Sequence, residues 1–132
     1  MIGLDSNVLA RYIVRDDAAQ AAQASRFLQT NCSPGTPGYI NCIVLSELAW
    51  LLRRGYKYKK ADVVKVLRQL LSTRQFLAED EARAWLALQD YEQGSADYAD
   101  YLIAQRNQHQ GCTQTVTFDR KAAKHPLFQK VS

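Results

Sequence analysis

The sequence contains few of the residues that build cross-linked or flexible proteins. Its 132 residues include three cysteines, three prolines and six glycines. Cys32, Cys42 and Cys112 are odd in number, lie far apart and form no CxxC pair, so they indicate neither a disulfide framework nor a structural zinc site. We therefore expect reduced thiols in a chain long enough to bury a core without cross-links.

Long hydrophobic runs are also missing. No apolar run approaches the roughly 20 residues of a transmembrane helix, and the start lacks the basic stretch and long apolar segment of a signal peptide. We expect a soluble cytoplasmic protein with no membrane partner. Because repeats and low-complexity tracts are absent too, we expect a single domain over residues 1–132.

Several catalytic signatures are absent. The sequence has no P-loop, no serine nucleophile elbow and no cysteine–histidine pair of the nucleophilic type. Its two histidines, His109 and His125, are isolated, and we expect both on the surface. The 17 basic and 13 acidic residues give a formal net charge of +4, which weakly favours an anionic partner such as nucleic acid.

The spacing of apolar residues predicts alternating strands and helices. Strands are expected at 1–5, 39–41, 74–78, 113–118 and 127–131. Helices are expected at 6–14, 17–30, 42–54, 60–72, 79–94 and 97–109. This alternation predicts an α/β fold in which helices pack on a mostly parallel sheet.

Two aspartates follow predicted strands. Asp5 comes at the end of the first strand and Asp119 follows the strand that ends at 118. Ligands bind at the carboxyl ends of parallel strands, so these two carboxylates could converge on one site. The alternative is that each aspartate only caps the helix that follows it.

Glu47 occupies an apolar environment on its predicted helix. Residues one turn before and after it, including Ile43 and Trp50, are apolar, so we expect Glu47 to face the core. A buried carboxylate requires a compensating charge. Either a salt bridge, for example to Arg53 or Arg54, or a bound metal ion or ligand could supply it.

Asp97 and Asp100 lie three residues apart at the start of a predicted helix. The pair matches a capping box, in which Asp97 is the N-cap. Asp97 is equally a candidate for the site. Asp5, Glu47, Asp100 and Asp119 together form a set of carboxylates without histidine or cysteine, which suits Mg²⁺ or Mn²⁺ and hydrolysis of a phosphodiester.

Four motifs, in order, resemble the PIN-domain nucleases. They are "LDSN" at 4–7, "LSELAWLL" at 45–52, "DYADYLIA" at 97–104 and "TFDRKAA" at 117–123. The resemblance extends from Asp5 to Lys124 and is strongest to the small VapC-type toxins of prokaryotic toxin–antitoxin pairs. It implies a three-layer α/β/α sandwich, Mg²⁺- or Mn²⁺-dependent cleavage of RNA that leaves a 5′-phosphate, a homodimer and a cognate antitoxin partner.

The resemblance also implies roles for individual residues. The metal ligands and catalytic residues would be Asp5, Glu47, Asp100 and Asp119, with Asp97 as a further acidic candidate. Residues that orient these acids would be Ser6, Asn7 and Thr117.

Basic residues near these motifs are candidates for RNA binding. The run "RRGYKYKK" interleaves tyrosines, which could stack on bases, with Arg53, Arg54, Lys57, Lys59 and Lys60. The alternative for this run is a solvated turn between two helices. Arg120, Lys121 and Lys124 follow Asp119 closely and are expected near the scissile phosphate.

Other functions remain open at the level of sequence. A dehalogenase-like phosphotransferase would need an aspartate where Asn7 stands, and a receiver domain would need further acids near the first strand. A PIN-like scaffold without activity that binds RNA or protein, and a nuclease directed at DNA, are both alternatives. The four intact acids argue against the first, and the short chain makes the second less favourable.

Overall fold

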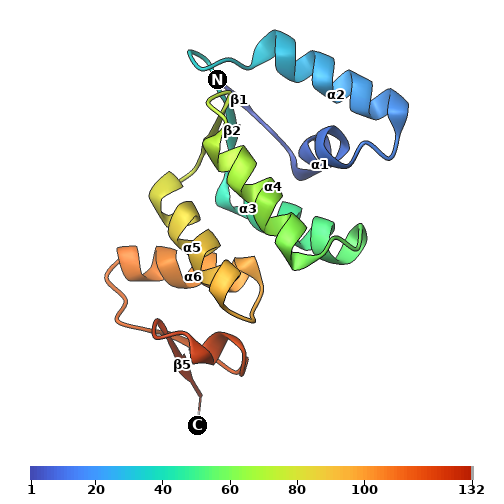
Figure 1. The fold of residues 1–132 in the computed structure, drawn as a ribbon. Coiled ribbons are helices and arrows are strands. Elements are labelled where there is room, and N and C mark those ends of the chain that lie inside the picture. The colour runs from blue at the N-terminus through green and yellow to red at the C-terminus, as the bar shows by residue number, and fades with distance from the viewer. Residues whose placement is uncertain (132) are drawn as a thin grey trace.

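The computed structural model describes residues 1–131 and shows alternating strands and helices (Figure 1). The strands are β1 (Ile2–Gly3), β2 (Gly38–Ile40), β3 (Phe76–Ala78), β4 (Thr115–Thr117) and β5 (Phe128–Lys130). The α-helices are α1 (Ser6–Val14), α2 (Ala18–Asn31), α3 (Cys42–Trp50), α4 (Lys60–Ser72), α5 (Glu81–Gln93) and α6 (Tyr98–His109). A π-helix, η1 (Leu51–Gly55), continues α3, and a short 3-10 helix, η2 (Ala122–Lys124), follows β4.

The strands form two parallel sheets. The first has the order β1-β2-β3, with Gly38 aligned between Ile2 and Phe76. The second pairs β4 with β5, with Thr115 opposite Phe128. The second sheet lies near the C-terminus, at the end of the molecule away from β1 and β2 (Figure 1).

Local sequence explains where the main helices begin. Asn41, directly after β2, accepts a hydrogen bond from the N–H of Val44 at 2.9 Å and so caps α3. Asp17 caps α2 in the same way through the N–H of Gln20. These caps turn the chain from an extended segment into a helix and thereby fix the direction in which α3 leaves the sheet.

One hydrophobic core connects the first sheet to the helices. Its fully buried members include Leu9 from α1, Leu45 from α3, Leu67 from α4 and Leu88 from α5. The hydroxyl of Tyr98, which is buried on α6, donates to a backbone carbonyl of α5 and locks these two helices together. Among residues 1–131, no helix is long and apolar enough to cross a membrane.

The predicted α/β class with parallel strands is confirmed, and the six predicted helices agree closely with the observed bounds. The structure differs from the expectation of one central sheet, because β4 pairs only with β5 in the described residues. Val116 is 62% exposed, and Phe118, just after β4, is 80% exposed. Short strands with polar neighbours do not determine from sequence alone which strand they pair with.

Candidate functional site

Three of the predicted acids lie near one another where α6 begins and β4 ends. After α6 the chain reverses, and β4 runs back along the helix, with the Asn107 amide donating to the Thr115 hydroxyl at 3.0 Å. From Asn107 back to Asp100 the helix covers about 10 Å, and from Thr115 to Asp119 an extended chain covers about 13 Å. The negative charge of Asp119 acts on the Asp100 carboxyl, so these two acids lie near each other.

Asp100 is partly buried and lies near two other negatively charged carboxylates. Its pKa is raised above the ordinary value, chiefly because burial disfavours the charged carboxylate, and the negative charges of Asp119 and Asp97 raise it further. A hydrogen bond from the Asp97 N–H, at 3.1 Å to Asp100 Oδ2, acts in the opposite direction. The predicted capping pair is therefore present, and it belongs to a cluster of three acids.

Asp119 is held by a tight turn. Its N–H donates to the Thr117 hydroxyl at 3.0 Å, while its Oδ1 accepts from the N–H groups of Lys121 and Ala122 at 2.7 and 3.2 Å. These bonds fix the carboxylate at the start of η2. Thr117, which the sequence predicted to orient this acid, thus contacts the Asp119 backbone.

Asp5, at the start of α1, lines a cavity to which none of the other predicted acids contributes. It is the N-cap residue of α1, yet its exposed carboxylate accepts no capping hydrogen bond, so the simple cap alternative does not explain it. This cavity has a volume of about 780 Å³, and Arg11 and Phe27 line it too. Its other lining residues are Leu4 and residues of β1, α1 and α2. Ser6 is buried and Asn7 is exposed beside it.

The prediction that Glu47 faces the core is wrong. Glu47 is exposed, and its apolar neighbours Ile43 and Trp50 are 71% and 56% exposed. These residues share an exposed face of α3, because positions four and three residues apart lie on one side of a helix. The opposite side of α3, with Leu45 and Leu48 fully buried, faces the core.

The donor chemistry of these acids suits a hard divalent cation, because every candidate ligand is a carboxylate oxygen. Within residues 1–131, however, no three histidine, cysteine, aspartate or glutamate side chains are arranged to hold a metal ion. Asp97, Asp100 and Asp119 therefore lie near one another without forming a complete set of metal ligands. Asp5 and Glu47 do not complete such a set either.

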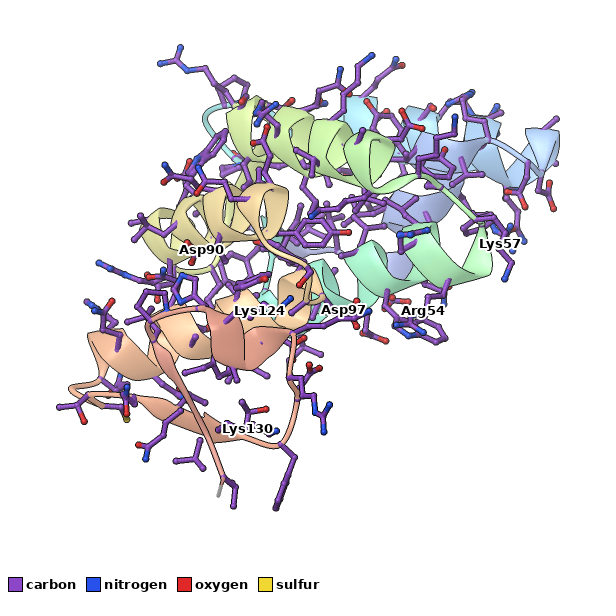
Figure 2. All side chains as sticks on the ribbon, turned by 60° about the horizontal axis from the view of Figure 1, so that its bottom comes forward. Arg54, Lys57, Asp90, Asp97, Lys124 and Lys130 are labelled. Atoms are coloured by element: carbon purple, nitrogen blue, oxygen red, sulfur yellow. The ribbon has the colours of Figure 1, made fainter. Side chains whose placement is uncertain are left out.

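The basic run after α3 has structural contacts of its own. Arg54 forms an exposed ion pair with Asp97 at 3.5 Å (Figure 2), and Arg53 donates to the Tyr58 carbonyl at 3.1 Å. Lys60 donates to the Gly94 carbonyl. The remaining predicted RNA-binding residues are exposed, namely Lys57, Lys59, Arg120 and Lys121.

Two polar networks were not anticipated from sequence. Glu79, at the end of β3, accepts from the Cys42 N–H at 3.0 Å and pairs with Arg106 at 3.0 Å, which joins the sheet edge to α6. The available signal in the sequence was that Glu79 directly follows a predicted strand. His125 is not the surface residue expected, because its side chain is 20% exposed and contacts Asp90 at 3.0 Å.

Comparison with known proteins gives the family. The PIN domain family model matches residues 2–126, which is nearly the whole chain. The chain belongs to the PIN-domain family. It is also similar to a VapC ribonuclease from Aquifex aeolicus (strain VF5), at 22% identity over 121 residues that cover 92% of this chain and 89% of the relative.

PIN-domain membership supports a nuclease and agrees with the α/β fold. The matched range contains all of the predicted acids, from Asp5 to Asp119. It also contains the basic residues Arg120, Lys121 and Lys124, which follow Asp119. The acidic cluster at the start of α6 is therefore the candidate active site of this PIN domain.

Proposed function

We propose that this PIN-domain protein is a divalent-metal-dependent endoribonuclease and the toxin of a toxin–antitoxin pair. The observation that carries the proposal is the family match over residues 2–126, in which an acidic cluster with a raised Asp100 pKa is followed in the chain by Lys121 and Lys124 at the two ends of η2. The similarity to a VapC ribonuclease supports RNA as the substrate.

Carboxylates of Asp100 and Asp119 would hold the metal ion, with Asp5 and Glu47 as the other proposed ligands. When bound, such an ion lowers the pKa of a water molecule and offsets negative charge on the phosphate. Because the donors are all oxygens, we propose Mg²⁺ or Mn²⁺. Asp5 and Glu47 are included on the strength of their motifs, and their variants test that assignment.

Residues around Asp119 would suit the binding of a metal cation and an RNA phosphate side by side. The N–H groups of Lys121 and Ala122 hold the Asp119 carboxylate in place. The exposed side chains of Arg120 and Lys121 follow immediately and would attract the phosphates of RNA. Asp97, through its pair with Arg54, keeps a further base close to the acids.

Cleavage of a single-stranded RNA by the purified protein tests the proposal. We expect cleavage with Mg²⁺ or Mn²⁺ and none in EDTA. Asp119→Asn and Asp5→Asn should each reduce the rate by about 100-fold or more, which corresponds to a loss of about 3 kcal/mol of transition-state stabilisation. Asp62→Asn, an exposed acid in the first turn of α4, is the matched control and should cleave normally.

Each alternative function predicts a different result. Equal cleavage in EDTA, or full activity of Asp119→Asn, contradicts the metal mechanism. RNA binding without cleavage indicates a PIN-like binding module, and faster cleavage of single-stranded DNA than of RNA indicates a DNA-directed nuclease.

The toxin assignment has its own test in cells. Expression of the protein should arrest growth, and co-expression of the neighbouring gene should relieve the arrest through the antitoxin. Asp119→Asn should not arrest growth. Light scattering of the purified protein tests the proposed homodimer, and growth that is unaffected by the active enzyme would contradict a toxin role.

A further inference from the structure

A polar cavity of about 510 Å³ adjoins the acidic cluster but is lined by other residues. It lies between the end of α5, the loop before α6 and η2. Its lining includes Gln93, Gly94, Ser95, Lys121, Lys124 and His125. Asp90 and Lys124, both labelled in Figure 2, lie on its wall. Neither the acids of the proposed active site nor the basic run at 53–60 contribute to it.

Two residues that line the cavity, Asp90 and His125, are held in place by contacts within the protein. Asp90 accepts from the Gln105 amide at 2.7 Å and contacts His125 Nε2 at 3.0 Å. The other ring nitrogen of His125 accepts from the Leu127 N–H at 3.1 Å. The Asp90 charge is therefore directed at protein partners, and the imidazole has no nitrogen left for a ligand.

One wall is equally rigid. Gly94 packs against the Tyr101 hydroxyl so closely that a Cβ at position 94 would lie 1.9 Å from that oxygen. The same hydroxyl accepts from the Ala96 N–H at 3.1 Å. Tyr101 is 1% exposed, so these contacts fasten the loop before α6 to a side chain of the core.

The cavity's free groups are cationic. Lys121, directly before η2, and Lys124, at its end, are exposed, and within residues 1–131 neither ammonium group takes part in a salt bridge. The Ser95 side chain lies at the same opening. Two unpaired ammonium groups beside a hydroxyl match the chemistry of a phosphate group.

The position of the cavity indicates the source of that phosphate. Lys121 donates its backbone N–H to Asp119, and Ser95 precedes Asp97 by two residues, so both walls continue directly into the acidic cluster. We propose that the cavity binds a backbone phosphate of the RNA strand, next to the one that is cleaved. This inference rests on the proposed ribonuclease function and adds a subsite to it.

Binding of a single-stranded RNA 12-mer in EDTA tests the subsite without cleavage. Replacing both lysines, Lys121→Gln with Lys124→Gln, should weaken binding about 10-fold and reduce the magnitude of the slope of log K against log salt by about 0.7, because the cavity would hold one phosphate and each phosphate contact on a single strand contributes about 0.7. The matched control replaces Lys65 and Lys130, two exposed lysines outside the cavity, by Gln and should change binding less than about 2-fold.

A second variant separates the cavity from its charge. Ser95→Phe fills the opening while both lysines remain, and it should also weaken RNA binding. If Ser95→Phe binds RNA normally, or if both lysine pairs cause the same loss, the subsite is overturned. If inorganic phosphate binds in a lysine-dependent way while RNA affinity is unchanged, the site serves free phosphate and the proposal is again overturned.

The result is independent of the test of the proposed function. Lysine- and Ser95-dependent RNA binding by a protein that cleaves nothing supports the subsite and rejects the nuclease. Cleavage that continues with unchanged RNA affinity in all three variants supports the nuclease and rejects the subsite.

Discussion

The two sheets of this protein differ in how they are covered, although the same chain builds both with parallel strands. In the first sheet, Ile40 of β2 is 1% exposed beneath the helices. In the second sheet, Val116 of β4 is 62% exposed, and Phe118 just beyond it is 80% exposed. The first sheet therefore contributes a strand that is buried beneath the helices, while the second leads into Asp119, Lys121 and Lys124 near the acids of α6.

The largest expected contrast is in stability. Leu45→Ala should lower the free energy of unfolding by about 2–5 kcal/mol, because Leu45 is fully buried and its removal leaves a cavity in the core. Phe118→Ala should change it by about 0.5 kcal/mol or less, because the ring is mostly in solvent. Urea denaturation of both variants measures the difference, and a large loss for Phe118→Ala would show that this ring is covered in solution.

The loop between α5 and α6 allows a sharper comparison with a loop beside the first sheet. Gly94→Ala places a Cβ against the buried Tyr101 hydroxyl and should cost about 1–3 kcal/mol through overpacking. Gly35→Ala, in the loop before β2, meets its nearest atom only at 4.0 Å and should be neutral or slightly stabilising. Thermal denaturation compares the two, and equal effects would mean that the loop before α6 yields easily.

Sequence reasoning succeeded where the deciding interactions are local. The helix bounds and the Asp97–Asp100 capping pair follow from residues within a few positions of each other, and both are present. The placement of Glu47 failed, because apolar neighbours such as Ile43 and Trp50 do not reveal whether a third element covers them.

The remaining differences are also non-local. Whether β4 joins β1 or only β5 depends on contacts between residues more than 100 positions apart, which periodicity does not encode. The contact between His125 and Asp90 was missed for the same reason, because nothing adjacent to either residue in the sequence indicates that they pair. The membership of Asp5 and Glu47 in the active site stays a prediction that the variants described above test.

A smaller effect concerns the pH dependence of the acidic cluster. Because the pKa of Asp100 is raised in the folded protein, the folded state binds this proton more tightly, and stability falls as the pH rises through the ordinary value of 3.8 toward the raised one. Asp100→Asn removes this cost and can keep the hydrogen bond from the Asp97 N–H.

The variant should therefore have a higher Tm than the wild type at neutral pH, and this gain should disappear at about pH 3, where both states hold the proton. Calorimetry across this pH range measures the difference. Asp62→Asn, whose carboxylate is exposed on α4, should show no such pH-dependent gain. A lower Tm for Asp100→Asn at neutral pH would mean that contacts stabilise the carboxylate by more than its burial and its repulsion from Asp119 and Asp97 cost.

The reactivity of the three cysteine thiols compares the two regions without any substitution. Cys112, in the exposed loop before β4, should react at once with an aromatic disulfide reagent. Cys42 is buried at the start of α3, and burial together with the Glu79 charge raises its pKa to about 11, so its thiolate is scarce at neutral pH. Cys32 is buried as well, and burial raises its pKa.

We therefore expect one thiol per chain to react rapidly and two to react only when urea unfolds the protein, as measured by absorbance of the released thiolate. Protection of the two buried thiols depends on how rarely the first sheet and its helices open. If two thiols react rapidly in the native protein, then the region around Cys32 or Cys42 opens as readily as the loop of Cys112. The contrast between a rigid first sheet and an accessible second one would then be wrong.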